Sequence, residues 1–245
     1  MAAKEILGIE PVEVGPVDPR LLGSKPLAIF DIDGVINRIP FTNNYTGPKC
    51  DCQISMWNWD CKHRSNRDNW AIERTPKDKD FFDDIPEGAN DAPGIHKDWQ
   101  YPLWISEELA GNIKELSESG LADVVFLSMW SSNTSYLNGY LGTKIPYVPI
   151  ARRMSESEHG VKHRALFHFF EDIDKLGKEI PAFTWTDDVV TEGAYGEDIH
   201  EIVSGMFSRS KIEEPSSFIL KTETTEGIRR SHWRQLLEFI DIHQQ

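Results

Sequence analysis

The sequence has few cysteines and no long apolar run. Three of its 245 residues are cysteine, Cys50, Cys52 and Cys61, and all of them fall in one short stretch. An odd number of crowded cysteines is not how a disulfide framework is distributed. No apolar run approaches the roughly 18 residues that a membrane span needs, and the N-terminus lacks the apolar core of a secretory signal. We therefore expect a cytoplasmic protein that does not associate with membranes.

Basic residues are also scarce. The sequence has 26 Lys and Arg against 40 Asp and Glu, which gives a formal net charge of −14. Because phosphate backbones are held chiefly by clustered Lys and Arg, we expect no broad nucleic-acid-binding face, although a local basic patch stays open. The remaining composition, 39% hydrophobic and 27% charged, is that of a globular protein. The length suits one domain, or one domain that carries an insertion.

Continuous apolar runs alternate with amphipathic patterns along the chain. Runs at 27–30, 124–127, 182–186 and 218–220 are typical of strands buried on both faces. Helical stripes separate them: one begins after Ser106 and ends at Gly120, and others cover 166–176 and 233–240. Buried strands that alternate with such helices predict an α/β fold, with a Rossmann-like parallel sheet flanked by helices.

Two stretches stand apart from this alternation. Residues 1–24 are rich in proline and show no period, so we predict an irregular N-terminal leader that packs loosely or not at all. Residues 25–245 then form the domain. Within it, the segment at about 37–101 is polar, holds all three cysteines and four of the eight tryptophans, and is too long for a plain loop. We predict that this segment is an inserted lid or small subdomain.

Polar residues follow three of the four predicted strands. Asp31 and Asp33 come after the first, Ser128 after the second, and Asp187 and Asp188 after the third. In parallel sheets, ligands bind beyond the carboxyl ends of the strands. Asp31 and Asp33 would face the same way if the strand continued, and two adjacent carboxylates favour a cation between them. Mg2+ suits such oxygen ligands and leaves room for water and a phosphate, and the third strand end could close the same site.

Other interpretations exist for these residues. An EF-hand calcium loop would need a glutamate at the twelfth position, where this chain has Thr42, but a plain turn at Asp-x-Asp-Gly stays open. Ser128 and Lys162 add the hydroxyl and the cation that a phosphate site requires. Each has an ordinary alternative, as a strand-ending cap and as a solvated lysine. Lys175 and Lys178 are further candidates for the cation, and Lys162 is preferred because it opens a predicted helix.

The residues taken together resemble a known family. The ordered set consists of Asp-x-Asp-Gly-Val at 31–35, Ser128, Lys162 and the Asp187-Asp188 pair. It is similar to the four motifs of the haloacid dehalogenase-like superfamily of phosphatases and phosphotransferases. The segments 128–130 and 225–228 resemble the branch found in bacterial and phage proteins and in RNA-repair fusion proteins. The resemblance covers about residues 25–36 and 102–243.

This resemblance implies a Mg2+-dependent phosphohydrolase, a phosphomonoesterase that works through an aspartyl-phosphate. Asp31 would be the nucleophile, and Asp33 would be the general acid and then the general base. A carboxylate at the position of Asp33 argues against haloacid chemistry, because only the phosphatase-like members of the superfamily have to protonate a departing alkoxide. The alternatives are a phosphotransferase with an acceptor other than water, or a catalytically silent binding module with the same fold.

The resemblance also implies how substrate and metal are held. Ser128 and Lys162 would bind the transferring group. Asp31, Asp187 and Asp188 would bind the metal together with the backbone carbonyl of Asp33. A small phosphorylated substrate is expected, with a nucleotide or a nucleic-acid terminal phosphate as the first class to try. Trp130 follows the phosphate-binding hydroxyl and either walls the substrate pocket or packs beneath a loop.

The predicted insertion carries one further metal hypothesis. Cys50, Cys52, Cys61 and His63 form a four-ligand set whose softness suits a structural Zn2+. The spacing is not a standard zinc pattern, and the alternative is a group of simply reduced cysteines. Tryptophans and basic residues of the same segment could stack a base and bind a phosphate, or could form the small core of the insertion.

Overall fold

The computed structural model describes residues 10–37, 73–75, 104–130, 134–150, 158–188, 203–205, 207–208, 212–223 and 227–244. The elements, in chain order, are η1 (Pro19–Leu21), β1 (Leu27–Phe30), β2 (Glu73–Thr75), β3 (Trp104–Ser106), α2 (Glu107–Ser119), β4 (Asp123–Phe126), α3 (Thr134–Leu141), α4 (Glu158–Lys175), β5 (Phe183–Asp187), β6 (Ser217–Lys221) and α6 (Arg230–Ile242).

Four of the strands form one sheet in the order β4-β1-β5-β6, and every neighbouring pair in it is parallel. These are the four strands that the apolar runs predict. All residues of β1 are buried, as expected for a central strand covered on both faces. Phe30 lies opposite Phe126 of β4 and Thr186 of β5, so the ends of the three strands are level. The predicted α/β fold with a parallel sheet flanked by helices is confirmed.

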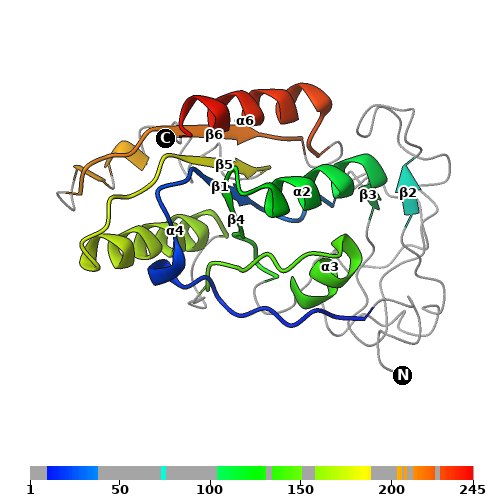
Figure 1. The fold of residues 1–245 in the computed structure, drawn as a ribbon, viewed down its shortest axis with the longest axis horizontal. Coiled ribbons are helices and arrows are strands. Elements are labelled where there is room, and N and C mark those ends of the chain that lie inside the picture. The colour runs from blue at the N-terminus through cyan, green and yellow to red at the C-terminus, as the bar shows by residue number, and fades with distance from the viewer. Residues whose placement is uncertain are drawn as a thin grey trace.

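Helices cover both faces of the sheet. Figure 1 shows α2 and α6 on one side of it and α4 on the other. Each side buries its own hydrophobic cluster, with Leu109 and Trp233 in the first and Leu166 and Phe170 in the second. Burial of these stripes is the main favourable term that holds the layers together. The result is a three-layer arrangement in which the strand ends form a common edge.

Local signals set the ends of the helices. The Ser106 Oγ accepts a hydrogen bond from the Leu109 N–H at 3.3 Å and so caps α2, and Gly120 ends the helix with φ of 74°. The apolar stripe predicted for the second helix extends one residue too far. Leu176 is 46% exposed, because α4 ends at Lys175 and the chain turns away through Gly177.

The N-terminal segment packs against the domain from residue 10 onward. The N–H of Val17 donates to the Tyr147 carbonyl at 2.8 Å, and Val17 is buried in the cluster on the α4 side. The Lys178 ammonium donates to the carbonyls of Arg20 and Leu22 at 2.7 and 2.8 Å. Residues 10–24 thus make specific contacts with the domain, although Val17 is the one buried residue among them. Part of this segment pairs with Tyr147, which in turn pairs with Phe126 of the edge strand β4. Backbone groups at the edge of a sheet need such partners.

The structure describes little of the predicted insertion at 37–101. The short strand β2 pairs in parallel with β3, which leads directly into α2. The proposed zinc ligands Cys50, Cys52, Cys61 and His63 lie outside the described residues. Among the helices that are described, none is long and apolar enough to cross a membrane.

Candidate active site at the carboxyl edge of the sheet

Asp31 lies directly beyond β1, the second strand of the sheet order. Its N–H donates to the Thr186 carbonyl at 2.9 Å, which continues the pairing of β1 with β5 by one residue. This register sets Asp31 beside Asp187, the last residue of β5. Both side chains are almost fully buried. The sheet itself thus brings together two carboxylates that are far apart in the sequence.

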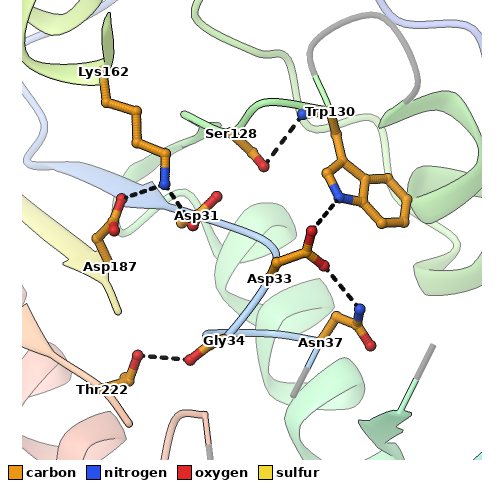
Figure 2. A network of polar contacts seen from close by, with 9 residues as sticks. All are labelled: Asp31, Asp33, Gly34, Asn37, Ser128, Trp130, Lys162, Asp187 and Thr222. Carbon is orange, nitrogen blue, oxygen red and sulfur yellow. Dashed lines mark hydrogen bonds and ion pairs between the residues drawn. The ribbon is translucent and has the colours of Figure 1, made fainter. Parts of the chain in front are cut away.

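Lys162 reaches this edge from the second turn of α4. Its side chain is fully buried, and its Nζ donates to Asp31 Oδ2 at 2.7 Å and to Asp187 Oδ2 at 3.0 Å (Figure 2). The other two candidate lysines lie elsewhere. Lys175 pairs with Asp172 on the surface of α4, and Lys178 binds carbonyls of the N-terminal segment. Of these three lysines, Lys162 is the one at the strand ends.

A third carboxylate completes an acidic group. Asp31, Asp187 and Asp188 each offer a ligand oxygen, and these oxygens lie within 4.8 Å of one another. Three carboxylates and the Lys162 ammonium leave a formal charge of −2 on these four side chains. Buried charge of this size has to be compensated, and one divalent cation would neutralise it. The donor set consists of oxygens alone, so it fits Mg2+.

Gly34 creates the space that Asp188 occupies. It has φ of 71°, and a Cβ at this position would lie 2.0 Å from Asp188 Oδ2 and 2.8 Å from Asp188 Cβ. Any side chain here would therefore displace the third carboxylate. Glycine also adopts this left-handed conformation without steric cost. The glycine of the Asp-x-Asp-Gly motif accordingly has a packing role in the acidic group.

The chain turns sharply after Asp31. The Gly34 N–H donates to the Asn37 carbonyl at 2.7 Å, and the Ile36 N–H donates to the Ile32 carbonyl at 3.0 Å. The strand conformation therefore does not continue. The condition under which Asp31 and Asp33 would face the same way is therefore not met, and the acidic group found among the described residues contains Asp31, Asp187 and Asp188.

The Asp33 side chain points to a different set of partners. Its Oδ2 accepts a hydrogen bond from the Trp130 Nε1–H at 2.8 Å, and its Oδ1 accepts one from the Asn37 Nδ2–H at 2.9 Å (Figure 2). Asp33 is half-buried, in contrast to Asp31. The involvement of its backbone carbonyl in metal binding stays a prediction.

Ser128 and Trp130 come from the end of β4, the strand beside β1. Ser128 is buried, and its Oγ accepts a hydrogen bond from the Trp130 N–H at 3.4 Å. Trp130 is 6% exposed and belongs to the same hydrophobic cluster as Phe126 and Leu137. Such burial leaves the indole little surface for a substrate, and its described apolar contacts are with this cluster. Its indole N–H contacts the candidate site by donating to the Asp33 carboxylate.

Two residues of this region were not found by sequence reasoning. Asn37 lies at the border of the predicted insertion, where the sequence has no period to mark it. Thr222 follows β6, and its Oγ1–H donates to the Gly34 carbonyl at 2.7 Å (Figure 2). The same strand-end argument that selects Ser128 would have selected Thr222, since it follows the fourth apolar run.

Comparison of the chain with protein-family models, with curated proteins and with solved structures gives no match in any of the three.

Proposed function

We propose that this protein is a Mg2+-dependent phosphohydrolase with a haloacid dehalogenase-like core, and that it works through an aspartyl-phosphate on Asp31. The observation that carries the proposal is the group formed by Asp31, Lys162, Asp187 and Asp188 at the carboxyl edge of the sheet. It combines a carboxylate nucleophile, a fixed cation and a set of oxygen ligands. The order of the motifs in the chain supports the same conclusion.

Asp31 is suited to attack phosphorus because its position is fixed. Its backbone is held by β5, and its Oδ2 is held by the Lys162 ammonium at 2.7 Å. The same ammonium can neutralise charge on a phosphoryl group that binds beside it. Bound Mg2+, held by Asp31, Asp187 and Asp188, would supply further positive charge to the phosphoryl oxygens. Ser128, on the neighbouring strand end, would donate its hydroxyl to the same group.

The proposed reaction has two steps, and Asp31 and Asp33 take part in both. A carboxylate oxygen of Asp31 forms a bond to phosphorus while the bond from phosphorus to the leaving oxygen breaks. Asp33, which enters this step as the carboxylic acid, gives its proton to that oxygen and becomes the carboxylate. A water molecule then attacks the phosphorus of the aspartyl-phosphate, its proton passes to Asp33, and the Asp31 carboxylate is released with inorganic phosphate.

A phosphorylated nucleotide or a nucleic-acid terminal phosphate is the substrate class that we propose first. This choice rests on the resemblance to the branch of the superfamily that includes RNA-repair fusion proteins. The acidic overall charge of −14 favours a small substrate or a chain end over a long nucleic-acid backbone.

The test is phosphate release by the purified protein with Mg2+. The substrates are nucleoside monophosphates, oligonucleotides with 3′- or 5′-phosphates, sugar phosphates and an aryl phosphate. We expect turnover that requires Mg2+ and is lost in Asp31→Asn. Asp241→Asn, an exposed site in α6, is the matched control and should retain full activity. Turnover that persists in Asp31→Asn, or no release from any of these substrates, would contradict the proposal.

A further inference from the structure

We propose that Trp130 and Asn37 are positioning residues that hold the Asp33 carboxylate in place for proton transfer. The inference rests on the proposed function, because it assigns the support of that reaction's acid and base. In this proposal both residues act through Asp33 and not by touching the substrate. Each donates one N–H to Asp33, and together they occupy both carboxylate oxygens with a donor.

The two hydrogen bonds fix the carboxylate from two directions. The Trp130 indole approaches Oδ2 at 2.8 Å from the β4 end, and the Asn37 amide approaches Oδ1 at 2.9 Å from the turn after β1 (Figure 2). Two donors on two different oxygens restrict rotation about the last side-chain bond of Asp33. Both donors are neutral, so they orient the carboxylate without supplying a counter-charge.

Both donors are themselves immobile. Trp130 is 6% exposed among core residues, and its backbone N–H is bound by the Ser128 Oγ. Asn37 is fully buried, and its backbone N–H donates to the Ile32 carbonyl at 2.8 Å. A closely packed indole with a single donor has one direction in which to give its hydrogen bond. Asp33 itself is half-buried, so these contacts do not enclose the residue completely.

Such support matters because proton transfer depends on geometry. A general acid has to lie within hydrogen-bond reach of the leaving oxygen, and small displacements of a reacting group lower the rate strongly. Loss of the indole N–H removes the hydrogen bond to Oδ2 and gives the Asp33 carboxylate more rotational freedom. We therefore expect an effect on kcat, with little change in KM, because Ser128, Lys162 and the metal-binding carboxylates are untouched.

The experiment compares Trp130→Phe with Trp233→Phe. Both tryptophans are buried in the same hydrophobic cluster at 6% and 7% exposure, so loss of volume should affect the fold similarly. We expect kcat to fall about tenfold in Trp130→Phe with KM and melting temperature close to those of Trp233→Phe. Equal kcat in the two variants would overturn the proposal.

A double variant separates positioning from a general structural effect. If Trp130 acts through Asp33, Trp130→Phe should lower kcat in the wild type but not in the Asp33→Ala background. An equal fall in both backgrounds would overturn the proposal. Asn37→Leu offers a second test by the same comparison, because it removes the other donor.

A further readout does not depend on turnover. The indole N–H resonance of Trp130, assigned by its loss in Trp130→Phe, should move strongly in Asp33→Ala and less in Asp33→Asn, which keeps an acceptor oxygen. A resonance that stays in place in Asp33→Ala would overturn the positioning contact itself. If no substrate is hydrolysed but this resonance moves, the proposed function fails while the contact between Trp130 and Asp33 stands.

Discussion

Asp31 and Asp33 are two residues apart, yet they lie in different surroundings. Asp31 is 2% exposed and is held by an ammonium, next to two further carboxylates. Asp33 is half-buried and is held by an indole and an amide, both neutral. In the proposed mechanism Asp31 receives the phosphoryl group and Asp33 exchanges a proton. Differences in environment of this kind are one way to separate the roles of two carboxylates.

The two surroundings also differ in what they contribute to stability. On the charged side, formed by Asp31, Lys162, Asp187 and Asp188, three carboxylates lie together and two of them, Asp31 and Asp187, bind the buried ammonium. Loss of that ammonium takes a positive charge away from a buried acidic group. The turn between the two aspartates is held by hydrogen bonds between neutral groups, which are of ordinary strength.

The largest effect is expected from Lys162→Met. It keeps the length and apolar part of the side chain but leaves Asp31 and Asp187 without their buried cation. We expect the free energy of unfolding to fall by about 3–5 kcal/mol in the absence of Mg2+. Mg2+ should stabilise the variant more than the wild type, because the ion compensates the same carboxylates.

Urea unfolding with and without Mg2+ measures both quantities. The matched control is Lys175→Met on the same helix, whose exposed ion pair with Asp172 should contribute little. If Lys162→Met is as stable as Lys175→Met without Mg2+, the charged side does not depend on the ammonium in the way described here.

The next largest effect is expected from Gly34→Ala, which would disturb the packing between the turn and the acidic group. The methyl group would overlap Asp188 and force its carboxylate away from Asp31 and Asp187. Gly177→Ala is the control, since Gly177 also has positive φ but a Cβ there meets nothing within 4 Å. Each variant should lose about 1–2 kcal/mol from the left-handed backbone.

The excess loss in Gly34→Ala, and weaker Mg2+ binding found in that variant alone, would report the displacement of Asp188. Calorimetric titration with Mg2+ provides this comparison. Unchanged Mg2+ affinity in Gly34→Ala would show that Asp188 is not needed for the metal.

The smallest effect is expected from Thr222→Val, which removes the hydrogen bond from β6 to the turn. The Thr222 hydroxyl is buried and donates to the Gly34 carbonyl, so its loss should lower the free energy of unfolding by about 1–2 kcal/mol. Thr184→Val is the matched control, because the Thr184 hydroxyl is buried and has no hydrogen-bond partner in the described part of the chain. Thr184→Val should be neutral or stabilising. Thermal unfolding of both variants measures the two losses, and equal losses would contradict a stabilising role for this hydrogen bond.

The sequence predicts the sheet well because its strands are buried on both faces. Continuous apolar runs such as 27–30 have no other favourable place than the centre of a covered sheet. The helix ends at Ser106 and Gly120 follow equally local rules. The packing of residues 10–24 could not be predicted this way, since it depends on backbone groups of the 146–148 segment beside β4 and not on any period in the leader.

The candidate site is predictable in part for the same reason. Their positions directly at the ends of buried strands identify Asp31, Ser128 and Asp187. The register of a parallel sheet brings such residues to one edge, independent of the segments that connect the strands. It cannot predict the orientation of Asp33, which depends on how the chain turns after β1. Nor could it show that Trp130 donates to Asp33, because that contact joins positions 97 residues apart through the packing of one buried indole.

The most direct test of the separate roles is an acid-quenched reaction with a labelled aryl phosphate. Its leaving group needs no proton, so Asp33→Ala should still form the aspartyl-phosphate but lack the base that activates water. We predict label on the peptide that contains Asp31 in Asp33→Ala, and no label in Asp31→Asn. Label that persists in Asp31→Asn, or its absence from Asp33→Ala while the wild type releases phosphate, would contradict the division of roles between these two aspartates.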